Sequence, residues 1–245
     1  MCTLTYIPLA KGDFLLTTNR DESPLRTPAR VPEIRQRPLR KVMFPVDGKA
    51  GGTWIATADD RRTVCLLNGA FEPHAWGGTY RKSRGLVVLE SFDYADTADF
   101  AVHYDFEGIE PFTLIGVDLG KEAPMTELRW DGAKLHRKAL DPAAPQIWSA
   151  AQLYKPEVIL RREQWFGEWL NGLPMDKALD AATVQRFHQF GGDGDISNDM
   201  RMNRGGMVRT VSTTVIENRS GATVMHYEDL LKSKSVKERL AERMA

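Results

Sequence analysis

A cysteine at position 2 and a run of four polar residues at positions 19–22 are the parts of this sequence best suited to chemistry. The run reads NRDE, and one β-rich segment separates it from the cysteine. Cys2 follows Met1 and is the kind of small residue that methionine aminopeptidase exposes. An exposed Cys2 carries a thiol, with an ordinary pKa of about 8.5, and an α-amine, with an ordinary pKa of about 7.7–8.0. The amine can accept the thiol proton, which is the chemistry of an N-terminal nucleophile.

A hairpin would bring these two features together. The β-rich runs on either side of Lys11-Gly12 predict two strands joined by a short turn. A two-residue turn places Cys2 opposite Asp21, and a three-residue turn places it opposite Arg20. Beside the thiol, Arg20 favours the thiolate, and Asp21 holds and orients the ammonium. The alternative is a small edge-strand cysteine and a solvated strand end.

Amide hydrolysis also needs donors for the developing oxyanion. Asn68 ends the run TVCLLN and precedes a glycine, so its amide is one candidate, with a simple turn asparagine as the alternative. A second amide donor is expected from Asn198 or Asn203, in a loop rich in glycine and aspartate, unless both are surface loop residues.

An arginine in a late β-branched run, Arg209 in MVRTVSTTVI, is the remaining catalytic candidate. A buried arginine is costly unless it is paired, and Asp21 is the expected partner. The alternative is an arginine on a solvated strand face. The substrate-binding candidates are Asn19, Trp54 and Asn198. Trp54 follows a glycine pair that lets the backbone approach another element closely.

The elements that would position these residues are pairs of strands around a central block of helices. Strands are expected at 3–8, 13–19, 53–58, 63–68, 112–118, 126–130, 134–138, 207–217 and 222–228, and helices at 82–92, 96–104, 156–171, 176–189 and 235–244. The last helix rests on a capping box, Ser235 with Glu238. Residues 20–50 read as a long loop. The pattern predicts an α+β fold in a single layered domain spanning 1–245.

Composition narrows the possible partners. The 33 basic and 33 acidic residues balance, which argues against a nucleic-acid or membrane-surface partner. No apolar run is long enough for a membrane span, and two cysteines are too few for a disulfide framework, so a cytoplasmic protein is expected. The five histidines lack metal-ligand spacing, so neither a metal nor another cofactor is predicted.

Five motifs together resemble the NRDE family, the group of transport and Golgi organisation protein two. They are MCTL, NRDE, GGTW, LLNG and VRTVSTTVI, in the family's order and at both ends of the chain. The resemblance implies a four-layer αββα sandwich of two antiparallel sheets between helix layers, similar to penicillin V acylase and conjugated bile acid hydrolase.

Carried over by motif, the resemblance makes Cys2 the nucleophile, Asp21 its amine-binding partner, Asn68 an oxyanion donor and Arg209 the late arginine. The acylases have their first arginine where this sequence has Thr18, and Arg20 is the neighbouring substitute. The expected activity is hydrolysis of a non-peptide C–N bond in an acylated small molecule through a Cys2 thioester. The alternative is a non-catalytic binding or trafficking protein for haem or a lipid-like acyl ligand.

Overall fold

Two antiparallel sheets face each other in the computed structural model, which describes residues 3–75, 77–122, 124–174, 179–219 and 221–242. The first sheet has the strand order β10-β1-β2-β12-β13-β14, with β11 paired to β12. Its strands are β1 (Thr3–Pro8), β2 (Phe14–Glu22), β10 (Gln146–Ser149), β11 (Asn203–Arg204), β12 (Val208–Arg219), β13 (Ala222–Asp229) and β14 (Lys234–Ala241).

The second sheet runs in sequence order from β3 to β9. Its strands are β3 (Arg30–Gln36), β4 (Lys41–Val46), β5 (Ile55–Ala58), β6 (Thr63–Asn68), β7 (Phe112–Val117), β8 (Met125–Trp130) and β9 (Leu135–Ala139). Every pair within it is antiparallel, so each strand returns beside its predecessor.

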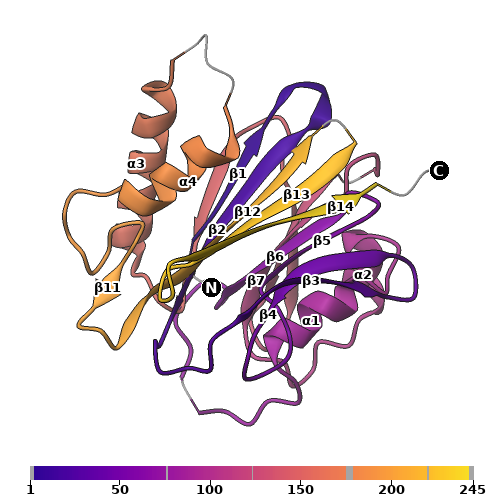
Figure 1. The fold of residues 1–245 in the computed structure, drawn as a ribbon. Coiled ribbons are helices and arrows are strands. Elements are labelled where there is room, and N and C mark those ends of the chain that lie inside the picture. Colours follow the sequence, from indigo (N-terminus) through magenta and orange to yellow (C-terminus); the bar gives the residue numbers. More distant parts are fainter. Residues whose placement is uncertain (1–2, 76, 123, 175–178, 220, 243–245) are drawn as a thin grey trace.

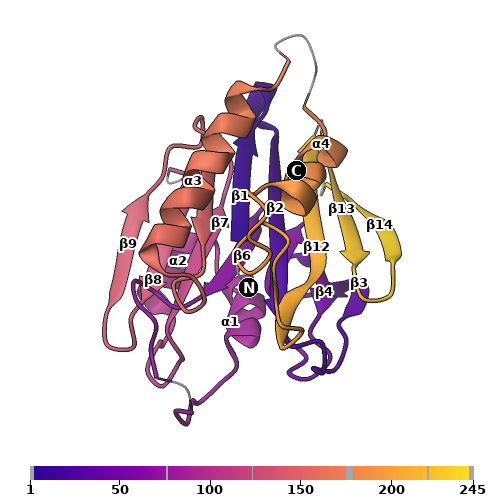
Figure 2. The same cartoon turned by 90° about the vertical axis from the view of Figure 1, so that its left-hand side faces the viewer.

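Helices cover the outer face of each sheet. The helices α1 (Arg84–Ser91) and α2 (Thr97–His103) pack on the second sheet, and α3 (Pro156–Asn171) and α4 (Ala181–Phe190) pack on the first. Figures 1 and 2 show the two helix pairs on opposite sides of the stacked sheets. The order of layers is therefore αββα, as expected. Across the described ranges, no helix combines the length and the apolar character needed to cross a membrane.

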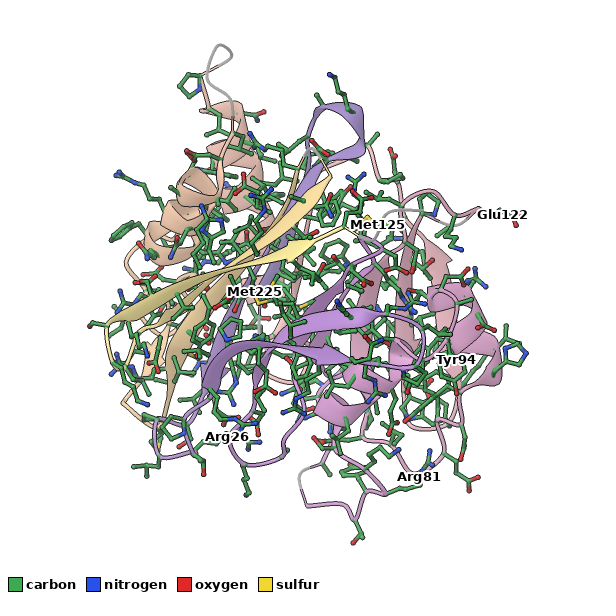
Figure 3. All side chains as sticks on the ribbon, turned by 45° about the vertical axis from the view of Figure 1, so that its right-hand side comes forward. Arg26, Arg81, Tyr94, Glu122, Met125 and Met225 are labelled. Atoms are coloured by element: carbon green, nitrogen blue, oxygen red, sulfur yellow. The ribbon has the colours of Figure 1, made fainter. Side chains whose placement is uncertain are left out.

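Side chains of both sheets interdigitate in the space between them. Leu4 and Leu16 from the first sheet share one buried cluster with Ile55, Cys65 and Ile115 from the second. Because neighbouring residues of a strand point to opposite faces, Leu15 instead joins the cluster beneath α3 and α4. Figure 3 shows the dense packing of side chains around Met225, a member of the inter-sheet cluster. This alternation fixes which face each residue of β2 presents.

Several expected elements are confirmed, and two are wrong. The helix at 156–171 and the strand at 63–68 have the expected bounds, whereas the helices expected at 82–92 and 96–104 are shorter. The expected helix at 176–189 begins at Ala181, although residues 176–178 lie outside the described part. The stretch 20–50 is not one long loop, because β2 continues to Glu22 and β3 and β4 follow.

The expected C-terminal helix at 235–244 is wrong, because strand β14 occupies most of this segment. Its residues pair with β13 from Asp229↔Lys234 to Ala222↔Ala241. Leu240 enters the inter-sheet core, while its neighbours on the strand are exposed. A capping box contributes only local stabilisation, which the ladder of strand hydrogen bonds and the burial of one face outweigh.

The second glycine of the GGTW motif allows close packing against the start of α1. A Cβ on Gly52 would lie 2.3 Å from the carbonyl carbon of Gly85 and 2.6 Å from the amide nitrogen of Leu86. Thr53 N–H donates to the Gly85 carbonyl oxygen at 2.9 Å, so the two backbones are held together. The close approach expected at the glycine pair is therefore confirmed.

Gly52→Ala is expected to destabilise the fold by about 1–3 kcal/mol, because the added methyl group meets backbone that must move. The free energy of unfolding in urea measures the change. Gly167→Ala is the matched control: it lies in α3 with no atom within 4 Å of the added Cβ. That variant should be stabilised by about 1 kcal/mol, since alanine favours a helix. Equal stability of Gly52→Ala and the wild type would contradict the packing argument.

Candidate active site

A cleft of about 730 Å³ opens where β2 and β6 end and α1 begins. Among the residues that line it are four of the expected site residues, Arg20, Asp21, Trp54 and Asn68. The connections that follow β2 and β6 lie at the same end of the molecule in two perpendicular views (Figures 1 and 2). The fold thus brings together residues that are up to 48 positions apart in the sequence.

Asp21 has a buried carboxylate that holds one hydroxyl group on each oxygen. Tyr154 donates to Oδ2 and Thr210 donates to Oδ1, both at 2.6 Å. Asp21 itself is 6% exposed. Each carboxylate oxygen can accept about two hydrogen bonds, so a hydroxyl donor does not preclude a second donor on the same oxygen. The two hydroxyls hold the carboxylate in one orientation, and its charge suits a cationic group.

Arg20 points toward the second sheet and is fixed by Asp47 and Trp54. Its Nη2 donates to Asp47 Oδ2 at 2.6 Å, and its guanidinium carbon lies 4.7 Å from the centre of the Trp54 ring. The Arg20 side chain is 7% exposed. A guanidinium held by a carboxylate and an aromatic face is a fixed positive charge at the wall of the cleft.

Asp47 joins two arginines of the cleft. Arg26 donates to it from Nε and Nη2, at 3.0 and 2.9 Å, and the backbone N–H groups of Lys49 and Ala50 donate to Oδ1. Burial opposes ionisation, but the hydrogen bonds from Arg26 and Ala50 and the two guanidinium charges outweigh it. Together they hold the pKa of Asp47 below its ordinary value. Figure 3 shows Arg26 at the lower end of the molecule.

Asn68 is the last residue of β6, with Gly69 in the left-handed conformation (φ +84°) directly after it. Its backbone oxygen accepts from Gln152 N–H at 3.2 Å, and its half-buried side chain lines the cleft. Within the described ranges, its side-chain amide has no hydrogen-bond partner. An amide at this position can donate to an oxygen that enters the cleft.

The register of the first hairpin is the one expected for the longer turn. Leu4 pairs with Thr18 and Thr3 with Asn19, so paired positions add up to 22, as in the alternative that sets Cys2 against Arg20. Cys2 itself lies outside the described residues. The hydroxyl of Thr18, which lies opposite Leu4, donates to the Thr3 carbonyl oxygen at 2.8 Å.

Asn19, which we expected to bind substrate, does not line the cleft, because its side chain faces away from it. It is fully buried on the helix side of the first sheet. Its Nδ2 donates to the carbonyl oxygens of His188 and Met200, and its Oδ1 accepts from Thr213. These bonds tie β2 to α4 and to the loop that follows it.

Asn198 and Asn203, from which we expected a second amide donor, do not line the cleft either. Asn198 Nδ2 donates to Asp195 Oδ2 at 2.8 Å and its Oδ1 accepts from Arg204 at 3.0 Å. Asn203 Oδ1 accepts from Gly206 N–H. Both side chains make hydrogen bonds within the loop before β12, outside the set of residues that line the cleft.

Arg209 does not form the expected ion pair with Asp21. It lies on β12 opposite Glu22. Its neighbour Thr210 lies opposite Asp21 and donates a hydrogen bond to the Asp21 carboxylate. Successive strand residues point to opposite faces, so Arg209 and Thr210 cannot both reach Asp21. Arg209 is half-buried and is not among the residues that line the cleft.

Three residues of the site, Asp47, Tyr154 and Thr210, were not predicted from the sequence. Asp47 lies in a turn-forming stretch, VDGKAGG, whose glycines are a weak signal for a functional loop. Tyr154 lies in a segment without a recognisable motif, and Thr210 is one of several threonines in its strand. Tyr154 contacts Asp21 across 133 residues of sequence, and Thr210 contacts it across 189. No local sequence pattern reveals contacts of this range.

Solved structures with the same fold come from hydrolases. Two variants of conjugated bile acid hydrolase from Clostridium perfringens match with a TM-score of 0.58, at 11% and 12% identity, covering 100% of this chain and 97% of theirs. The Caenorhabditis elegans orthologue of N-acylethanolamine-hydrolyzing acid amidase matches with a TM-score of 0.57 at 12% identity, covering 88% of this chain and 92% of its own. This similarity establishes the N-terminal-nucleophile hydrolase fold.

The family assignment comes from the sequence itself. No curated protein matches the chain. The model of the family described as Transport and Golgi organisation 2 matches residues 1–224, which include all five motifs that carried the resemblance. The chain therefore belongs to the Transport and Golgi organisation 2 family.

Proposed function

We propose that this protein is a cysteine-dependent amidohydrolase that cleaves a non-peptide C–N bond in an acylated small molecule. The observation that carries the proposal is the oriented Asp21 carboxylate in the wall of a cleft that also contains Arg20 and Asn68. Thr3 pairs with Asn19 at this end of the sheet, and one peptide unit, about 3.8 Å between Cα atoms, joins Cys2 to Thr3. The nucleophile would then be within reach of all three groups.

The proposed reaction begins when removal of Met1 frees the α-amine of Cys2. That amine accepts the thiol proton, and Asp21 binds the resulting ammonium. The thiolate sulfur attacks the carbonyl carbon of the amide, and the fixed charge of Arg20 favours the thiolate. Asn68 donates to the oxyanion, a contribution worth about 3–4 kcal/mol to the transition state in comparable hydrolases.

The tetrahedral intermediate then collapses with cleavage of the C–N bond. The ammonium of Cys2 gives its proton to the departing amine, leaving an acyl thioester on the sulfur. Water attacks this thioester with the α-amine as the base, which releases the carboxylic acid and restores the thiol. Two structural neighbours are named as a conjugated bile acid hydrolase and an N-acylethanolamine-hydrolyzing acid amidase, which supports a hydrolytic reaction here.

The test is a panel of N-acylated amino acids and amines incubated with the purified protein and quenched in acid. We expect release of the amine and, in the same samples, a covalent adduct on the protein with the mass of the acyl group. Peptide mapping should locate that adduct at Cys2. If neither amine nor adduct forms with any member of the panel, the proposed function is contradicted.

A further inference from the structure

A buried chain of contacts connects α3 to the carboxylate of Asp21. Arg162 is fully buried in α3, and its guanidinium carbon lies 3.7 Å from the centre of the Tyr154 ring. The Tyr154 hydroxyl donates to Asp21 Oδ2 at 2.6 Å. Tyr154 is itself 1% exposed, so this series of contacts is closed to solvent. None of these contacts has a part in the reaction proposed above beyond holding Asp21.

A second arginine lies against the same ring. The Arg204 guanidinium carbon is 5.1 Å from the centre of the Tyr154 ring, and its nitrogens donate to the carbonyl oxygens of Leu153 and Ser197 and to Asn198 Oδ1. Two cations close to one phenol are attracted to the ring face, and they hold the ring in place. The hydroxyl of this ring donates to a carboxylate, and hydrogen bonds to a charged acceptor are the strong ones.

Arg162 also connects this series of contacts to the beginning of β1. Its Nη1 donates to Thr3 Oγ1, and its other nitrogens donate to the carbonyl oxygens of Asn198 and Asp199. A buried charge is costly unless its donors are satisfied, and here two carbonyls, a hydroxyl and an aromatic face satisfy it. One side chain thus fixes both the residue that follows Cys2 and the ring that holds Asp21.

We propose that Tyr154 is a positioning residue of this site: Arg162 and Arg204 hold its ring, and its hydroxyl fixes the Asp21 carboxylate in the orientation that binds the α-ammonium of Cys2. This inference rests on the proposed function for the role of the ammonium. Thr210 fixes the other carboxylate oxygen, so loss of the Tyr154 hydroxyl removes one of the two hydroxyl donors that orient the Asp21 carboxylate.

The test compares Tyr154→Phe with Tyr6→Phe. Both variants remove one buried tyrosine hydroxyl and keep the ring, but the hydroxyl of Tyr6 donates to the Pro142 carbonyl oxygen, away from the cleft. For Tyr154→Phe we expect kcat to fall by about 10- to 100-fold, the value of one hydrogen bond to a charged group, with KM unchanged. Alkylation of Cys2 by iodoacetamide at pH 7 should slow several-fold. Tyr6→Phe should match the wild type in both measurements.

The two measurements separate this proposal from the proposed function. Selective slowing of alkylation in Tyr154→Phe, with no amide hydrolysed even by the wild type, would contradict the hydrolase and support the positioning role. Equal kcat and equal alkylation in Tyr154→Phe and the wild type would overturn the positioning role. If Tyr154→Phe fails to fold, Arg204→Gln keeps the hydroxyl and removes one cation from the ring. A loss of kcat in the same direction would then support the proposal, and an unchanged kcat would overturn it.

Discussion

Replacing Cys2 with alanine is expected to lower amide hydrolysis by more than about a thousandfold while leaving the fold intact, because the variant lacks the attacking sulfur. The rate of amine release, measured with the best substrate of the panel, reports the loss. The acyl adduct should also disappear from the intact-mass spectrum. Thermal unfolding should be unchanged, since the substitution precedes the first residue of β1.

Cys65→Ala is the matched control for this variant. Cys65 is fully buried between the sheets, and burial raises the pKa of its thiol to about 12. A thiol with that pKa is not a nucleophile at neutral pH. Cys65→Ala should therefore keep its activity and lose about 1 kcal/mol of stability from the small cavity. Undiminished turnover in Cys2→Ala would move the chemistry to another residue.

The second large effect is expected for Asp47→Asn. This change removes the carboxylate that holds Arg20 and Arg26 and leaves a guanidinium with 7% exposure short of a counter-charge. Loss of one partner from a buried pair costs about 3–5 kcal/mol. Arg20 would also lose its fixed position, so kcat/KM should fall by about 10- to 100-fold. Urea unfolding and steady-state kinetics measure the two effects.

The stability of the wild type should also depend on pH through Asp47. Its pKa is lower in the folded protein than the unfolded value of about 3.9. The stabilisation is therefore complete above about pH 4 and is lost as the pH falls through the folded pKa. Asp47→Asn should lack this acid-sensitive part of the stability. Identical slopes of stability against pH below pH 4 in the two proteins would contradict the role assigned to Asp47.

Asp93→Asn is the comparison for Asp47→Asn. It removes a carboxylate that pairs with Arg37, but both side chains are about one-quarter to one-third exposed. Pairs of this kind contribute at most about 1 kcal/mol. An equal loss of stability in the two variants would show that Asp47 holds Arg20 no more strongly than a surface pair.

The sequence predicts the fold well where periodicity and end signals agree. The helix at 156–171 has proline in its first turn and glycine directly after its end, and both bounds are confirmed. The stretch 20–50 misleads because β3 is an edge strand with mostly exposed, charged residues, a composition shared with loops. The segment at 235–244 misleads because a helix cap is a local signal, while β14 is selected by pairing with β13.

Prediction of the site follows the same division. The hairpin places Arg20 and Asp21 near the start of β1 by local geometry alone, and the bounds of β6 place Asn68 at its end. The partners of Asp21 come from β12 and from the segment before α3, which only the folded chain brings together. Asn19, Asn198 and Arg209 do not line the cleft, and the sequence could not show this, because residue type does not reveal which face of an element a side chain occupies.

Intact-mass analysis before and after brief treatment with iodoacetamide at near-neutral pH shows directly whether Cys2 is an exposed and activated nucleophile. We expect a protein that lacks Met1 and gains one carbamidomethyl group, mapped to Cys2, much faster than an ordinary exposed thiol reacts. Cys65 should remain unmodified in the folded protein, because it is buried. Retention of Met1, or a Cys2 that reacts no faster than an ordinary exposed thiol, would contradict the role of Cys2 as the nucleophile.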